Sequence, residues 1–150
     1  MGNDSENNSD GSRKRIRVVA ATIERDGKFL ITQRRAEAVL PLLWEFPGGR
    51  VEAGESDAGA LQRELDERLG ARIEVGDELA TIFHDYERYS VTLVIYQATL
   101  LAGELEPRRV NEYRWVPSSE FGNYEFPPAD QSTMDKLLGE AGGNAGAAAD

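Results

Sequence analysis

The chain has 150 residues, 40% hydrophobic and 29% charged, so a single domain with one core is the simplest organisation. Its net charge of −10 disfavours binding to nucleic acid or to an anionic membrane surface, and no apolar run approaches the roughly 20 residues that span a bilayer. The chain has no cysteine, which excludes disulfides and thiolate metal sites, and its polar N-terminus lacks a signal-like segment, so we expect a cytoplasmic protein.

Two polar or small-residue tails flank the predicted domain. Met1 to Arg13 is rich in Asn, Asp, Ser and Gly, and Gly139 to Asp150 is mostly Ala and Gly, so neither segment has apolar surface to bury. We expect both tails to be disordered. The folded domain is then predicted to run from Lys14 to Leu138, without an internal repeat or linker.

Strands dominate the pattern of this domain. The expected strands are Ile16 to Ile23, Phe29 to Gln33, Ile73 to Val75, Leu79 to His84, Ser90 to Leu101 and Tyr113 to Val116. Arg25 to Lys28 reads as a hairpin turn between the first two strands, and Pro47 to Gly49 as a chain break before a first helix. A second helix is expected to open at Pro128. Without regular βαβ alternation, this order predicts an α+β fold or mixed-sheet sandwich.

The first helix carries the side chains with the most chemistry. Ser56 is its expected N-cap and Gly70 its C-terminal stop. At about 100° per residue, its apolar face holds Ala58, Leu61, Leu65 and Leu69, and its opposite flank holds Arg63, Glu64, Glu67 and Arg68. Glu64 and Glu67 are three residues apart, so their carboxylates repel unless a cation lies between them, and oxygen ligands favour Mg²⁺ or Mn²⁺ over zinc. The alternative is that this flank is only solvated helix surface.

The segment around this helix matches a long motif. From Gly49 the order is Gly, five residues, Glu55, seven residues, and then R-E-L-D-E-R-L-G-A over Arg63 to Ala71. This order resembles the Nudix box, G-x5-E-x7-R-E-U-x-E-E-x-G-U, where U is aliphatic. Glu45 to Gly49 and Phe126 to Asp130 resemble the MutT-type branch, which includes the 8-oxo-dGTP diphosphatases. The resemblance covers essentially the whole folded part and implies the Nudix fold, a mixed β-sheet between α-helices.

The resemblance also implies an activity. Members of this branch hydrolyse nucleoside triphosphates, some of them oxidised, to a nucleoside monophosphate and pyrophosphate, which cleans the nucleotide pool. Matching positions imply that Glu64, Glu67 and the carbonyl of Gly48 hold Mg²⁺, with Mn²⁺ as a possible substitute. Glu64 would also orient or deprotonate the attacking water. Arg63 belongs to the same catalytic set and is expected to pair with Glu55.

Three further positions match substrate-contacting residues. Arg34 would contact a phosphate or the base, or else is an exposed arginine at a strand end. Phe46 would stack on the base, or else is a core phenylalanine. Asp130 lies where the 8-oxo-dGTP enzyme has asparagine, and an ionised aspartate only accepts hydrogen bonds, unless it merely caps a helix. An acceptor favours an exocyclic amino group, so the base stays open between oxidised guanine and cytosine. The residues expected to be structural are His84, Trp44 and Trp115.

Two arginines depart from the family pattern. Arg68 stands where the box has a metal-binding glutamate, which changes the local charge by two units, and it lies four residues after Glu64, a spacing that favours an ion pair. The distal metal glutamate, six residues before Trp115, falls at Arg109, and Glu112 is the only nearby substitute. These losses predict weakened metal binding and reduced activity. The alternatives are a non-catalytic Nudix domain that binds a nucleotide as a sensor or partner, and introduced alterations of an active parent.

Overall fold

The computed structural model describes residues 14–38, 41–102 and 104–128. Its elements are β1 (Lys14–Thr22), β2 (Glu24–Arg25), β3 (Lys28–Gln33), β4 (Trp44–Glu45), β5 (Gly48–Arg50), α1 (Asp57–Leu69), β6 (Arg72–Asp85), β7 (Tyr89–Ala102), β8 (Glu112–Val116) and the 3-10 helix η2 (Ser118–Asn123). The two expected tails and the expected second helix after Pro128, with Asp130, lie outside the described residues. In the described ranges, no helix is long and apolar enough to cross a membrane.

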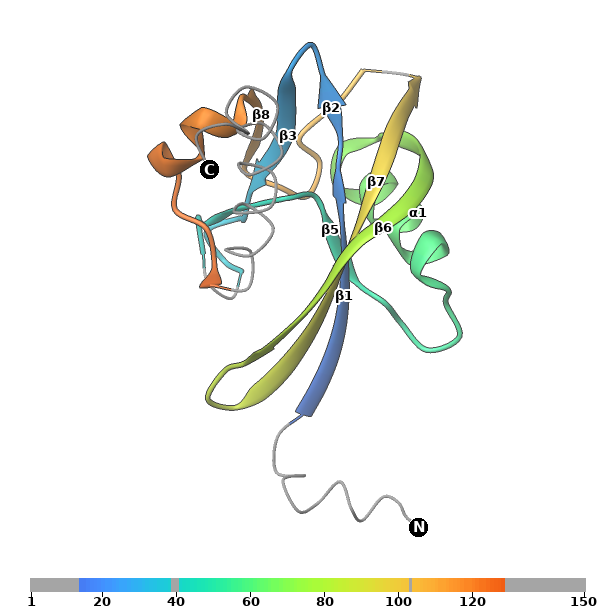
Figure 1. Cartoon of the computed structure of the whole chain (residues 1–150), viewed down its shortest axis with the longest axis vertical. Helices are drawn as coiled ribbons and strands as arrows, with labels where there is room; N and C mark the ends of the chain where they lie inside the picture. The colour runs from blue at the N-terminus through green and yellow to red at the C-terminus, as the bar shows by residue number, and fades with distance from the viewer. Residues whose placement is uncertain (1–13, 39–40, 103, 129–150) are drawn as a thin grey trace, which may run out of the picture.

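Two four-stranded sheets make up the strand framework of the described residues (Figure 1). The first has the order β5-β1-β7-β6, in which β1 runs parallel to β7 and the other neighbours are antiparallel. The second is centred on β3, which pairs antiparallel with β2, β4 and β8. The mixed first sheet and the antiparallel second sheet, together with α1, confirm the predicted α+β fold.

Alternating side chains of the strands supply two apolar cores. Because successive side chains in a strand point to opposite faces, Val19 and Ala21 pack under α1, whereas Ala20 lies in the other core. That second core is rich in aromatic rings and includes Trp44, Phe46 and Phe121. Figure 1 shows α1 on one side of β1 and β7, with β8 and η2 on the other. The cavity described below opens beside β1, where these layers meet.

The predicted ends of α1 are confirmed, but its predicted buried face is wrong at two positions. The side chain of Ser56 caps the helix, and Gly70 ends it in the left-handed region at φ 66°. Ala58 is exposed, and Ala60 is buried in its place. Glu64, expected on the polar flank, is only 7% exposed.

A tertiary contact in the first turn explains this rotation of the helix. Asp57 accepts hydrogen bonds from Arg17 of β1 at 2.9 and 2.7 Å and from the Tyr96 hydroxyl of β7 at 2.6 Å. Asp57 therefore faces the sheet. Residues three, four and seven positions after Asp57 lie on the same face of the helix as Asp57. Ala60 and Glu64, three and seven positions after it, therefore also face the sheet.

Other differences from the sequence prediction arise from strand pairing. The two strands expected on either side of Gly76 are one strand, β6, because pairing with β7 continues on both sides of register shifts between Val75 and Ala80. The expected break at Pro47 to Gly49 overlaps strand β5, which pairs with β1. The 3-10 helix η2 was not predicted; its buried Phe121 packs into the aromatic core.

Candidate active site

Two glycines of β5 allow close approaches on either side, Gly48 to the neighbouring strand β1 and Gly49 to α1. A Cβ on Gly48 would collide with the carbonyl oxygen of Val19 in β1. A Cβ on Gly49 would collide with the carboxylate of Glu64 in α1. Only a residue without a side chain permits either approach, so Gly49 makes room for the Glu64 carboxylate above the strand.

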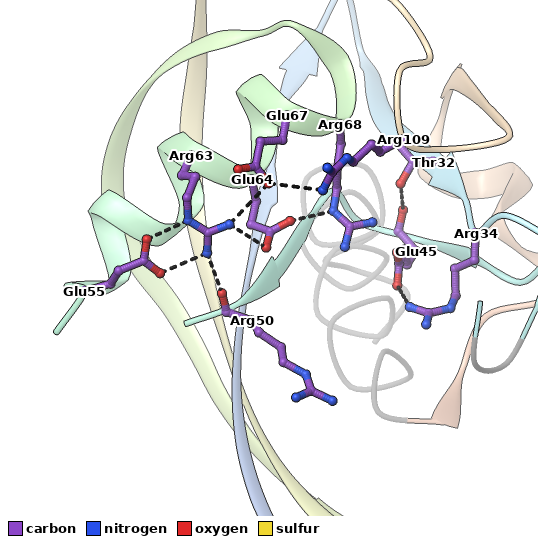
Figure 2. A network of polar contacts seen from close by, with 10 residues as sticks. All are labelled: Thr32, Arg34, Glu45, Arg50, Glu55, Arg63, Glu64, Glu67, Arg68 and Arg109. Atoms are coloured by element: carbon purple, nitrogen blue, oxygen red, sulfur yellow. Dashed lines mark hydrogen bonds and ion pairs between the residues drawn. The ribbon is translucent and has the colours of Figure 1, made fainter. Parts of the chain in front are cut away.

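Arg63 gathers three carboxylates around one guanidinium (Figure 2). It donates to both oxygens of Glu55, from Nε at 2.6 Å and from Nη2 at 2.9 Å, which confirms the expected pair. Its Nη1 donates to Glu64 at 3.1 Å and to Glu67 at 3.3 Å, and its Nη2 also donates to the carbonyl of Arg50 at 3.0 Å. These contacts tie the loop before α1, the end of β5 and the helix together.

The Arg63 contact lowers the pKa of Glu55 to about 2, from an ordinary value of 4.5. The folded state therefore binds fewer protons than the unfolded state in this range, so the stability from this pair is present above about pH 4.5 and is lost as pH falls toward 2. Glu55→Gln is expected to flatten that part of the pH dependence of the unfolding free energy, measured by urea denaturation. Glu74→Gln, at an exposed strand position, is the control, and equal flattening by both variants would contradict the assignment.

Arg68 and Arg109 occupy the remaining sides of the two helix carboxylates. Arg68 Nε donates to Oε1 of Glu64 at 2.6 Å, which confirms the ion pair expected from their spacing, while Arg63 approaches Oε2. Arg109 Nη1 lies 3.6 Å from Oε1 of Glu67. The side chain of Glu64 is 10% exposed and that of Glu67 is 39% exposed. Each carboxylate therefore already has a guanidinium partner, and these arginines largely neutralise the negative charge that would attract a cation.

The loop before β8 places Arg109 beside the helix. The backbone N–H groups of Arg108 and Arg109 donate to the carbonyl of Arg68 at 2.9 and 3.1 Å, and that of Glu106 donates to the carbonyl of Leu69 at 2.9 Å. These bonds satisfy carbonyl groups that the last turn of a helix leaves without intrahelical partners. The side chain at position 109 is thereby held close to Glu67.

Glu112, the expected substitute ligand, has a different partner. It pairs with Arg114 on the same strand at 3.2 Å. Within residues 14–38, 41–102 and 104–128, no group of three acidic or histidine side chains is arranged to hold a metal ion. Glu64 and Glu67 nevertheless offer oxygen donors, and a hard cation bound through one or two carboxylates takes its other ligands from phosphates and water. The residues present therefore fit a single divalent cation that competes with the arginines.

A cavity of about 290 Å³ opens beside this cluster. Its charged lining residues are Arg34, Glu45, Arg50 and Arg68, and its apolar wall is formed by Ile16, Val18, Tyr86, Tyr89, Val91 and Leu93. Arg34 donates to Glu45 at 3.1 Å, and burial raises the pKa of Glu45 against the opposing effect of Arg34. A concave site with one apolar wall and a few charged groups suits a small ligand that has both an aromatic and an anionic part.

The structure brings some of the predicted substrate residues to this cavity. Arg34 lines it and is paired with Glu45, so it is more than an exposed arginine at a strand end. Phe46 is 2% exposed and packs against Phe121 and Phe126 at ring distances of 5.7 and 5.6 Å, yet it also contributes to the cavity lining.

The residues expected to be structural pack against other side chains. The ring of His84 packs against Tyr86 at 4.5 Å, Trp44 is buried in the aromatic core, and the guanidinium of Arg25 lies over the ring of Trp115. Four lining residues, Glu45, Arg50, Tyr86 and Tyr89, had no role predicted from the sequence. Glu45 lies in the motif Glu45 to Gly49, but the motif by itself gives it no role.

Comparisons with known proteins agree with the sequence motif. The family model of the NUDIX domain matches residues 18–136. The chain is 39% identical to the CTP pyrophosphohydrolase of Escherichia coli over 125 residues, which cover 83% of this chain and 93% of that protein. It is 33% identical to the 8-oxo-dGTP diphosphatase of Haemophilus influenzae over 130 residues, covering 85% and 95%.

A solved structure extends the likeness to three dimensions. The solution structure of the E. coli ORF135 protein superposes with a TM-score of 0.75 at 38% sequence identity, covering 85% of this chain and 91% of that one. The match with the family model and the matches with the two enzymes each span most of the chain. The chain therefore belongs to the Nudix family and is an enzyme of the MutT-type Nudix class.

Proposed function

We propose that this chain hydrolyses nucleoside triphosphates to a nucleoside monophosphate and pyrophosphate with the help of Mg²⁺, and more slowly than a typical relative. The observation that carries the proposal is the buried carboxylate of Glu64, held by Arg63 beside a cavity with arginines and an apolar wall. The names of the relatives, a CTP pyrophosphohydrolase and an 8-oxo-dGTP diphosphatase, support this substrate class. The expected slowness follows from Arg68 and Arg109, which compete with a cation for the carboxylates.

The side chains of this site have different roles in the proposed reaction. Glu64 orients the attacking water and accepts its proton, while Arg63 keeps the Glu64 carboxylate in place. Glu64, Glu67 and the carbonyl of Gly48 are the groups that would hold Mg²⁺ or Mn²⁺. When bound, the ion supplies positive charge that stabilises the transferring phosphoryl group. Arg34 contacts the substrate from across the cavity.

The glycine pair of β5 gives a test of the placement of Glu64. Gly49→Ala is expected to displace the Glu64 carboxylate and to lower kcat by about 10²-fold, because small misplacements of a reacting group are costly. Gly48→Ala meets the backbone of β1 instead and is expected to lower the unfolding free energy by about 1–3 kcal/mol, and it also displaces a carbonyl that would hold the metal ion. Steady-state kinetics and urea denaturation measure kcat and stability separately for each variant. A loss of stability without loss of kcat in Gly49→Ala would contradict this placement.

Base recognition involves Phe46 and Asp130 in this proposal. Phe46, which contributes to the cavity lining, contacts the base, and Asp130, outside the described residues, accepts a hydrogen bond from an exocyclic amino group. Asp130→Asn is expected to shift the preference between CTP and 8-oxo-dGTP by about 1–3 kcal/mol in relative kcat/KM. Equal losses for every nucleotide would instead identify Asp130 as a helix cap.

The experiment that tests the function is pyrophosphate release across a panel of nucleoside triphosphates, including CTP, dCTP, dGTP and 8-oxo-dGTP, with Mg²⁺ and with Mn²⁺. The expected result is slow formation of a monophosphate and pyrophosphate from one member of the panel. Nucleotide binding without hydrolysis under every condition would favour the second candidate, a non-catalytic nucleotide-binding domain. The ion pairs of Arg68 and Arg109 are the observation that supports this candidate.

A further inference from the structure

Three arginines reach the cavity from different elements. Arg34 follows β3, Arg50 ends β5, and Arg68 lies in the last turn of α1. Glu45 is the only acidic residue among the described lining residues. The cavity lining therefore carries three guanidiniums and one carboxylate, although the net charge of the whole chain is −10. A polyanion that enters the cavity meets a locally positive surface.

Arg68 uses only part of its guanidinium in the ion pair with Glu64. Its Nε donates to Oε1 at 2.6 Å, and in the described part of the chain its two terminal nitrogens have no hydrogen-bond partner. The side chain is 27% exposed and borders the cavity. A guanidinium presents a planar fork of donors that matches phosphate oxygens, so the terminal nitrogens are available to an anionic ligand.

We propose that Arg68, together with Arg34 and Arg50, binds the polyphosphate of the nucleotide directly, without an intervening divalent cation. The inference rests on the proposed function for its substrate class. A glutamate at this position repels phosphate oxygens unless a cation lies between them. Arg68 instead forms charge-assisted hydrogen bonds with them. Binding of the polyphosphate and binding of the metal ion are therefore separable in this chain.

Calorimetric titration of the full chain with inorganic tripolyphosphate in EDTA tests this proposal, because the probe carries the phosphates without a base. We expect binding in the absence of divalent cations. Arg68→Gln is expected to weaken it at least about tenfold, which is about 1.4 kcal/mol or more. Arg68→Lys keeps the charge but loses the fork of donors, and should give an intermediate affinity.

Arg108→Gln is the matched control. Arg108 also donates from Nε to a glutamate, Glu106, at 2.8 Å, but it is not among the residues that line the cavity. This variant should bind tripolyphosphate as tightly as the unaltered chain. No binding in EDTA, or equal losses for Arg68→Gln and Arg108→Gln, would overturn the proposal. Should Arg68→Gln fail to fold, as judged by its melting curve, undiminished binding by Arg68→Lys overturns the role of the donor fork.

Hydrolysis is measured separately so that the two proposals fail in different ways. Tripolyphosphate binding in EDTA, without nucleotide hydrolysis at any Mg²⁺ concentration, refutes the proposed function and leaves the direct phosphate contact intact. Nucleotide hydrolysis with Mg²⁺, without tripolyphosphate binding in EDTA, refutes the direct contact and leaves the proposed function intact.

Discussion

Arg68→Glu is expected to tighten Mg²⁺ binding and to raise kcat for nucleoside triphosphate hydrolysis, by roughly 10- to 100-fold. In the structure, Arg68 Nε holds Oε1 of Glu64 at 2.6 Å and so competes with a cation for that oxygen. The substitution removes the competitor and adds a carboxylate one helical turn from Glu64. The local charge changes by two units toward what a divalent cation requires.

Metal titration followed by steady-state kinetics measures both effects, with Arg108→Glu as a control for the change of charge. Without metal, Arg68→Glu places like charges four residues apart and should lower the melting temperature, which Mg²⁺ should then restore. Adding Arg109→Glu should raise kcat further, but by less than the product of the separate gains, because Glu64, the partner of Arg68, and Glu67, the partner of Arg109, would serve one metal site. Metal binding in the double variant without any hydrolysis would favour the non-catalytic binder.

Glu64→Gln is expected to lower kcat by about 10²- to 10⁴-fold, the range that a general base contributes. The neutral amide cannot accept the proton of the attacking water. It also lacks the negative charge with which the carboxylate would attract a metal cation. Its side-chain volume is nearly that of Glu64, and it keeps one oxygen acceptor for Arg63 or Arg68, so thermal denaturation should show a folded protein.

Glu106→Gln, on the exposed loop before β8, is the control for Glu64→Gln and should retain kcat. A folded Glu64→Gln variant with undiminished kcat would show that another group accepts the proton. Glu45 would then be the group to test, since it is the only residue with a carboxylate among the described residues that line the cavity.

Features that depend on short spacings could be predicted from the sequence. Ser56 and Gly70 end the helix as expected, because capping needs only the local side chain or a residue that tolerates positive φ. The pairs Glu55–Arg63 and Glu64–Arg68 follow from the motif and from helical spacing, respectively. The α+β class followed from the order of strands and helices.

Features that depend on contacts between distant segments could not be predicted. The burial of Glu64 and Ala60 follows from the contacts of Asp57 with Arg17 and Tyr96, about 40 residues away in either direction, and no local pattern reveals them. The tyrosines of the cavity wall lie near Ile16 only because β1 pairs in parallel with β7. A crossover of that length leaves no local signal for the register.

The dependence of nucleoside triphosphate hydrolysis on Mg²⁺ concentration, measured on the member of the panel that is hydrolysed and compared between the unaltered chain and Arg68→Glu, tests the central claim most directly. We predict that the unaltered chain forms the nucleoside monophosphate and pyrophosphate slowly, and that its rate saturates at a higher Mg²⁺ concentration than the rate of the variant. The physical reason is that Arg68 must release Glu64 before a cation can bind there. Rapid hydrolysis by the unaltered chain, with the same Mg²⁺ dependence as the variant, would contradict this account.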